Sequence, residues 1–244
     1  GNGDEGGSVY VNNGEIDADN VKFTNNVASL VGGAIKVENI ASIVTLKNAL
    51  FENNQGSHGG AISIVDDLTV EPLVQDSDFR NNVAAIGSGG AISSSSKMTI
   101  SVTNFEDNAA NAGQGGGLSV TKDLTITGSS FKRNKALKGG AIDSYDNKVT
   151  MANMVVENNT ALEEGGAFNA LNSEYDVSTS TIKSNKAKRG GAIRSKSTGC
   201  TTDCKKLVIK TSTLENNEAS GEAGAIDFDA EAGRNHSFGS KILP

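Results

Sequence analysis

The chain has 244 residues and a formal net charge of −7. The acidic balance argues against a nucleic-acid partner, because phosphate binding needs a basic surface, and no apolar run is long enough for a membrane-spanning helix. With 29 Gly, 2 Pro, no Trp and 36% hydrophobic residues, the composition fits neither an ordinary globular core nor a disordered chain, and favours a narrow core of small side chains repeated many times.

Two tetrads alternate along the chain. The first is Gly-Gly-Ala-Ile, with close variants. It recurs at 6–9, 32–35, 59–62, 89–92, 115–118, 139–142, 165–168, 190–193 and 223–226. The second places an aromatic or smaller apolar residue three positions before an Asn. Its apolar members are Phe23, Phe51, Phe79, Phe105, Phe131, Val156, Ile182 and Leu214. Its Asn members are Asn26, Asn54, Asn82, Asn108, Asn134, Asn159, Asn185 and Asn217.

A third element, apolar-Thr-apolar, lies between each Gly-Gly tetrad and the next Phe-type residue. It occurs at 44–46, 68–70, 98–100, 124–126 and 149–151. Its alternation is typical of short strands that are half buried. Because successive Phe-type residues lie only 25 to 32 positions apart, one period holds three short strands and their turns, and no helical periodicity is present.

Stacking these periods predicts an all-β fold, a single-stranded right-handed parallel β-helix (a β-solenoid) of about eight coils with three short strands per coil. The whole chain, 1–244, is expected to be one domain. Within it, the repeats cover 6–226, an insertion covers 194–206, and 227–244 forms a tail or a partial coil.

The tetrads also predict what the repeated residues do. Gly-Gly supplies positive φ angles or a close approach of the backbone at a corner. The Phe-type column is expected to stack inside the rod. The Asn column can form a ladder of amide hydrogen bonds from coil to coil, and Asn also tolerates the left-handed region.

Charges alternate in sign at the position after the Phe-type residue. They are Glu52, Arg80, Glu106, Lys132, Glu157, Lys183 and Glu215. The residue before Gly-Gly alternates in the same way at Lys138, Glu164, Arg189 and Glu222. In-register coils would set each charge between opposite ones, and each such pair is worth about 0.2–1 kcal/mol.

Few residues point to chemistry beyond the fold. Cys200 and Cys204 are too isolated for a zinc site. A small disulfide loop between them is predicted, which would indicate an oxidising compartment, and two free thiols in a cytosolic protein are the alternative. Asn158 and Asn235 match the glycosylation acceptor pattern, which applies in a eukaryotic host. No catalytic set, cofactor or metal site is predicted.

The eight interleaved tetrad pairs, which span Gly6 to Ile226, resemble the repeats of the chlamydial polymorphic outer membrane proteins. That resemblance implies a surface-exposed passenger with an adhesive role. The first hypothesis is therefore an extracellular or cell-surface structural and adhesive module, not an enzyme. It would act on a protein or glycan surface through a rigid repetitive face, with end-to-end self-association as a further expectation.

Two alternatives belong to other classes. A polysaccharide-active enzyme of the pectate-lyase kind shares this architecture, but it needs converging carboxylates or a basic residue beside calcium. An ice-binding solenoid needs a regular row of Thr on a flat sheet. The candidates for that row are Thr45, Thr69, Thr99, Thr125 and Thr150.

Overall fold

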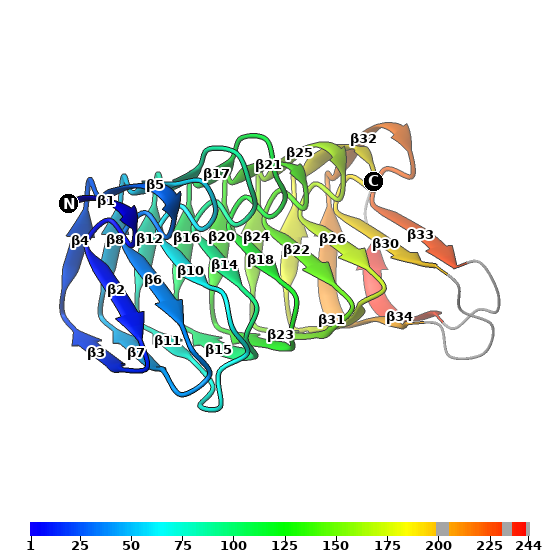
Figure 1. The fold of residues 1–244 in the computed structure, drawn as a ribbon. Helices are drawn as coiled ribbons and strands as arrows, with labels where there is room; N and C mark the ends of the chain where they lie inside the picture. The colour runs from blue at the N-terminus through cyan, green and yellow to red at the C-terminus, as the bar shows by residue number, and fades with distance from the viewer. Residues whose placement is uncertain (199–204, 231–235, 243–244) are drawn as a thin grey trace.

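The computed structural model describes residues 1–198, 205–230 and 236–242. These residues form a parallel β-helix of about eight coils, and all of their regular elements are strands (Figure 1). Every pair of neighbouring strands is parallel, and each strand pairs with its equivalent in the next coil. The predicted solenoid is thus confirmed.

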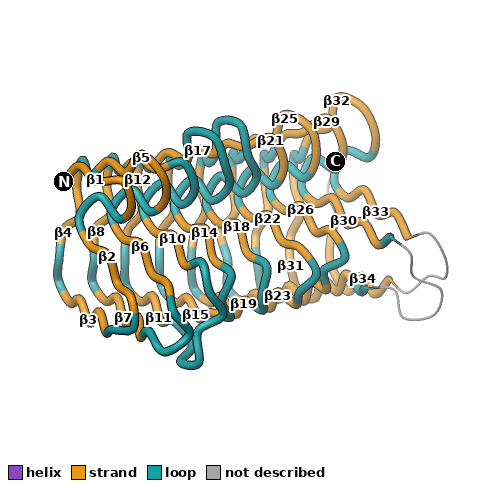
Figure 2. Tube along the Cα trace, viewed as in Figure 1, coloured by secondary structure: helices purple, strands orange, loops and turns teal. Residues whose placement is uncertain are grey.

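Three sheets run the length of the rod, connected by the loops shown in Figure 2. The first sheet consists of β1 (Asn2–Glu5), β5 (Val27–Val31), β9 (Gln55–Gly56), β13 (Val83–Ala84), β17 (Ala109–Ala110), β21 (Lys135–Lys138), β25 (Thr160–Glu164), β29 (Lys186–Arg189) and β32 (Glu218–Glu222). The second sheet consists of β2 (Val9–Asn12), β6 (Ile35–Glu38), β10 (Ile62–Ile64), β14 (Ile92–Ser94), β18 (Leu118–Val120), β22 (Ile142–Tyr145), β26 (Phe168–Leu171), β30 (Ile193–Ser197) and β33 (Ile226–Ala230).

The third sheet is bent and holds two short strands from most coils. Its first column is β3 (Glu15–Asp19), β7 (Ile43–Lys47), β11 (Leu73–Gln75), β15 (Met98–Ser101), β19 (Leu124–Thr127), β23 (Lys148–Ala152) and β27 (Glu174–Ser178). Its second column is β4 (Lys22–Thr24), β8 (Leu50–Glu52), β12 (Asp78–Arg80), β16 (Asn104–Glu106), β20 (Ser130–Lys132), β24 (Val155–Glu157) and β28 (Thr181–Lys183). The longer β31 (Leu207–Glu215) runs through both columns, and β34 (His236–Ile242) pairs with it.

The three predicted sheets are present, but the strands are divided among them differently from the expectation. The Phe-x-x-Asn strand shares the third sheet with the apolar-Thr-apolar strand, and a residue of positive φ such as Asn48 or Val102 bends the chain between them. The first sheet is built from the residues that follow the Asn. Sequence analysis assigned no strand there, because strands as short as Gln55–Gly56 have no alternation to detect.

One predicted strand was wrong. Residues 68–70 lie in the loop before β11, and the strand forms at Leu73–Gln75 instead. The inward-pointing residue of this element lies five positions before the Phe-type residue in neighbouring coils, as Ile100 does before Phe105. Val74 satisfies that spacing, whereas Val70, the inward residue of the expected strand, lies nine positions before Phe79 and is exposed. Consequently Leu73, not Thr69, lies between Thr45 and Thr99.

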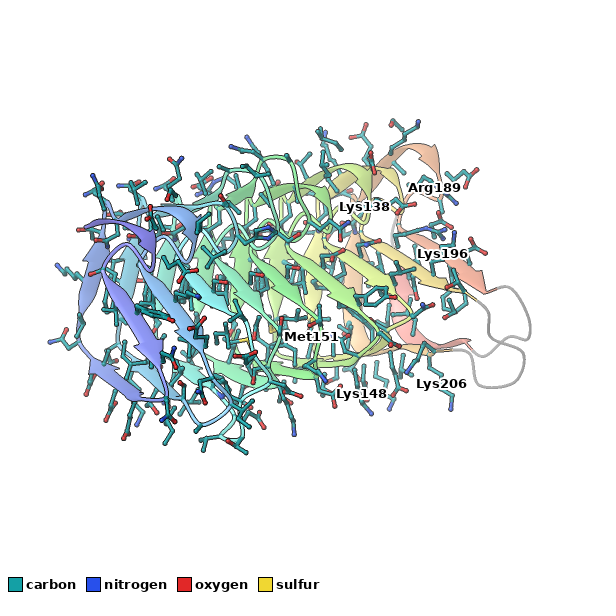
Figure 3. All side chains as sticks on the ribbon, viewed as in Figure 1. Lys138, Lys148, Met151, Arg189, Lys196 and Lys206 are labelled. Atoms are coloured by element: carbon teal, nitrogen blue, oxygen red, sulfur yellow. The ribbon has the colours of Figure 1, made fainter. Side chains whose placement is uncertain are left out.

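A main hydrophobic core runs along the rod, a small separate cluster of Ala84, Ala110 and Ala136 lies at the first sheet, and charged side chains extend from the surface. In Figure 3, Met151 lies inside the rod, whereas Lys148 and Arg189 extend from its surface. The Gly-Gly corner permits this close stacking. Gly139 has a φ of 59°, and a Cβ on Gly140 would lie 2.2 Å from the carbonyl oxygen of Gly166 in the next coil.

A candidate binding cleft on the second sheet

The Phe-type column stacks along the rod axis. Ring centroids of successive Phe residues from Phe23 to Phe131 are 4.6 to 4.9 Å apart, and the rings are nearly parallel. Val156, Ile182 and Leu214 continue the column in register. All are buried, so this column fixes the register of the third sheet and belongs to the scaffold.

The Asn column forms a buried hydrogen-bonded ladder. The side-chain Nδ2 of Asn108 donates to Oδ1 of Asn134 at 3.0 Å and to the carbonyl of Phe79 at 2.9 Å, and its backbone N–H donates to the same Oδ1. The side-chain bond to the next Asn repeats from Asn26 to Asn217. The ladder thereby satisfies polar groups that would be costly to bury unpaired.

The left-handed residue of this turn is not the ladder Asn. It is the residue before it, which is why that position also accepts Arg133 and Ser184, both with a φ of 55°.

Sequence analysis missed a second ladder, made by Ser or Thr two positions before the Phe-type residue. The N–H of Thr103 donates to Oγ of Ser129 at 3.0 Å, and the N–H of Ser180 donates to Oγ of Ser212 at 3.1 Å. The recurring Ser/Thr-x-Phe pattern was the available signal.

The alternating charges lie in register across the third sheet. Arg80 lies between Glu52 and Glu106 in the strand register. The same register continues through Lys132, Glu157 and Lys183 to Glu215. Glu157 forms ion pairs with Lys132 at 3.2 Å and Lys183 at 3.1 Å. Partial burial disfavours its carboxylate, but the hydrogen bonds from both Lys residues outweigh this and lower its pKa.

Other members of the column find different partners. Arg80 pairs with Asp78 of its own strand at 2.8 Å, and Glu106 pairs with Arg133. These pairs are largely exposed, so each contributes little to stability.

The remaining candidates are dispersed. Asn158 is exposed at the corner of its coil with a φ of 59°. Cys200, Cys204 and Asn235 lie outside the described residues. Among the residues that are described, no group of three or more His, Cys, Asp or Glu is placed to hold a metal ion.

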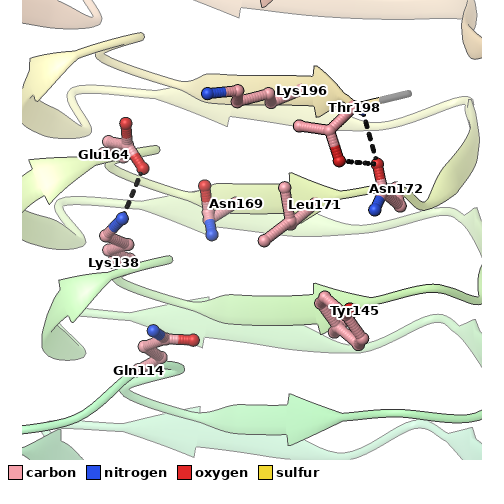
Figure 4. A pocket seen from close by; sticks show the side chains of 9 residues that line it. All are labelled: Gln114, Lys138, Tyr145, Glu164, Asn169, Leu171, Asn172, Lys196 and Thr198. Atoms are coloured by element: carbon pink, nitrogen blue, oxygen red, sulfur yellow. Dashed lines mark hydrogen bonds and ion pairs between the residues drawn. The ribbon is translucent and has the colours of Figure 1, made fainter. Parts of the chain in front are cut away.

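A cleft of about 310 Å³ opens on the outer face of the second sheet (Figure 4). Its lining residues are Gln114, Lys138, Tyr145, Glu164, Asn169, Leu171, Asn172, Lys196 and Thr198. They come from four successive coils, and in the sheet Tyr145, Leu171 and Lys196 form one outward row. On one wall the Nζ of Lys138 pairs with Glu164 at 2.8 Å.

A row of buried polar residues lies beside the cleft. Asp143, Asn169 and Arg194 are register neighbours on β22, β26 and β30. Nδ2 of Asn169 donates to Oδ1 of Asp143 at 2.7 Å. Burial raises the pKa of Asp143 to about 7, although the hydrogen bond from Asn169 and the charge of Lys138 oppose the shift.

The buried cation of this row lies beside two carboxylates, although its Nε and Nη1 form no hydrogen bond with any described residue. Arg194 is 1% exposed and contacts Asp227 at 3.1 Å and Asp229 at 3.0 Å. Those two carboxylates therefore serve an ion-pair network.

The cleft could not be found from the tetrads, because its lining residues lie beside them and not within them. The signal was a break in an outward column. Three middle coils carry Ser63, Ser93 and Ser119 at the position where later coils carry Asp143 and Asn169, and the first two coils carry Tyr10 and Lys36 there.

The comparisons with known proteins bear on the fold. A family model for the right-handed beta helix region matches residues 7–182, well over half of the chain. No curated protein and no solved structure matches. No described segment forms a helix that is long and apolar enough to cross a membrane. The chain therefore belongs to the right-handed beta-helix family.

Proposed function

We propose that this chain is a structural and adhesive module of an extracellular or cell-surface protein, and that it binds its partner through the outer face of the second sheet. The cleft is the observation that carries this proposal. It extends over four coils that the Asn ladder and the apolar core hold in register, so its side chains keep fixed spacings without a closing movement.

Two features of the sequence support the location. The tetrads resemble those of the surface-exposed polymorphic outer membrane proteins, and the close pair Cys200 and Cys204 suits an oxidising compartment. End-to-end stacking of two copies is a separate prediction. Electron microscopy of the purified chain checks it, because filaments would support stacking and single short rods would reject it.

Bead adhesion tests the proposed role. Beads coated with the chain are passed over glycan-coated and cell-coated surfaces, and retention is compared with albumin-coated beads. Leu171→Trp fills the cleft and should reduce retention, whereas Leu162→Trp changes an exposed residue of the first sheet and should not. Retention no greater than that of albumin beads on every surface would reject the proposal.

A polysaccharide-active enzyme is the second candidate, and one observation favours it. Two neighbouring carboxyls have pKa values shifted in opposite directions. Burial raises the pKa of Asp143, whereas the pKa of Glu164 is lowered because the hydrogen bond from Lys138 outweighs partial burial. Such a pair can act as acid and base. The position of Asp143, buried and outside the cleft lining, weighs against it.

Turnover decides between the two candidates. Release of reducing ends from polyuronides or neutral glycans, lost in both Asp143→Asn and Glu164→Gln, would replace the adhesive proposal with the enzyme.

A further inference from the structure

The first sheet and the connections that leave it carry exposed apolar side chains along one side of the rod (Figure 1). Ile86 and Leu162 are 69% and 68% exposed, which makes them the two most exposed large hydrophobic residues in the described part of the chain. Four successive strands of this sheet, β5, β9, β13 and β17, contain no charged residue. Apolar surface that no charge interrupts is typical of a contact with another protein.

Two apolar knobs, Leu30 and Ile86, lie on the N-terminal half of this sheet. Leu30 is 51% exposed on β5, and Ile86 follows β13 by two residues. Backbone hydrogen bonds place them in one row, because the N–H of Ser57 donates to the carbonyl of Leu30, and the N–H of Ile86 donates to the carbonyl of Ser57. The knobs are therefore two coils apart, which is roughly 10 Å along the rod.

Two depressions lie on the C-terminal half of the same sheet. The first has a volume of about 210 Å³, extends over β17, β21 and β25, and has Ala110 and Ala136 in its lining. The second has a volume of about 230 Å³, extends over β25, β29 and β32, and has Ala161 and Ala187 in its lining. Small side chains at these positions leave room for a larger one from outside. The centres of the depressions, at β21 and β29, are likewise two coils apart.

Knobs and depressions match each other under a half-turn. The middle strand of the nine is β17, and a half-turn about an axis along it, in the plane of contact, exchanges β13 with β21 and β5 with β29. Ile86 of each copy then faces the first depression of the other copy, and Leu30 faces the second. An arrangement with parallel rods would set knob against knob and leave both depressions unfilled.

We propose that two copies of the chain pair side by side, with antiparallel rods, through the outer surface of the first sheet. Nine strands that are about 4.8 Å apart and about 13 Å long give each copy a face of roughly 500 Å². The total of roughly 1,000 Å² is at the lower end for a specific interface, so the dimer is expected to be weak. The pairing leaves the second sheet open and does not depend on the adhesive proposal.

Sedimentation equilibrium of the whole chain, from about 1 µM to about 1 mM, tests the pairing. We expect a monomer–dimer equilibrium with a Kd of about 10–100 µM. Small-angle X-ray scattering at the highest concentration gives the shape of the dimer. A side-by-side dimer keeps the length of one rod and doubles its thickness, whereas an end-to-end dimer doubles the length.

Matched variants locate the interface. Ile86→Lys places a charge on a knob and should weaken dimerisation about tenfold or more. Thr160→Glu places a charge in the first depression and should weaken dimerisation similarly, while the fold tolerates it because the register neighbours of Thr160 are Lys135 and Lys186. Ile40→Lys makes the matching change at a 60% exposed residue between β6 and β7 and should change nothing. Circular dichroism confirms that each variant is folded.

Three results would overturn the proposal: a chain that stays monomeric at the highest concentration, a dimer of doubled length, or a dimer that is unchanged in Ile86→Lys. Failure of the adhesive function is a separate result. Leu171→Trp, on the second sheet, should reduce bead retention and leave the dimer intact.

Discussion

The buried carboxyl of Asp143 makes the stability of the rod depend on pH. Its Oδ1 accepts a hydrogen bond from Asn169, and burial raises its pKa to about 7, against about 3.9 for an exposed Asp. The folded chain therefore holds a proton that the unfolded chain releases between pH 4 and 7. Stability falls as the pH rises through this window, by about 4 kcal/mol in total.

Asp143→Asn should remove this penalty. An amide cannot ionise, and its oxygen can still accept the hydrogen bond from Asn169. We expect equal stabilities for wild type and variant at pH 4. At pH 8 the variant should be more stable by several kcal/mol, which corresponds to roughly 10 °C in Tm for a chain of this size.

Thermal and urea unfolding followed by circular dichroism at pH 4, 6 and 8 measures the effect. Asp146→Asn is the matched control. It removes one negative charge from the same coil at an exposed position whose φ of 54° suits Asn. Parallel pH dependences for wild type and Asp143→Asn, or a less stable variant at pH 8, would refute the reasoning.

Three further variants test the scaffold, each by urea unfolding. Phe105→Ala opens a gap in the ring stack and should lower the free energy of unfolding by about 3–5 kcal/mol, with a clearly smaller loss in Phe105→Leu; equal losses would count against stacking. Asn108→Ala leaves buried groups of the Asn ladder unpaired and should lower the free energy of unfolding by about 1–3 kcal/mol per group. Asn111→Ala, at an exposed position, should have little effect. Gly140→Ala forces a Cβ against backbone and should prevent stable folding, while Gly14→Ala, whose Cβ would make only ordinary van der Waals contacts from 3.8 Å, should fold. A stable Gly140→Ala chain would contradict the close-approach argument.

The stacked interior could be predicted because its residues repeat for a physical reason. An inward side chain contacts its equivalents one coil above and below, so Phe79 favours Phe51 and Phe105 as neighbours. The register follows from the same columns. The charges on either side of Glu157 supported it independently, because only one alignment places Lys132 and Lys183 beside that carboxylate.

Two kinds of feature escaped prediction. The strands of the first sheet were not predicted, because a strand such as Ala109–Ala110 forms by pairing with the backbone of neighbouring coils and is too short to show alternation of its own. The strand at 68–70 was misplaced because these residues match the apolar-Thr-apolar pattern. The spacing to Phe79 decides which residue faces the core, and it selects Val74. A longer connection before β11 absorbs the difference.

The cleft could not be recognised because outward side chains are free to differ from coil to coil. In the buried outward column, Ser63 satisfies the fold without charge, whereas Lys36, Asp143 and Arg194 occupy equivalent places in other coils. Burying such groups disfavours folding by several kcal/mol unless they are paired. Each of these groups has a partner on a neighbouring residue: Lys36 pairs with Glu5 and Glu38, Arg194 pairs with Asp227 and Asp229, and Asp143 accepts a hydrogen bond from Asn169. A charge in this column therefore depends on partners that differ from coil to coil, and no repeat of the tetrads predicts them.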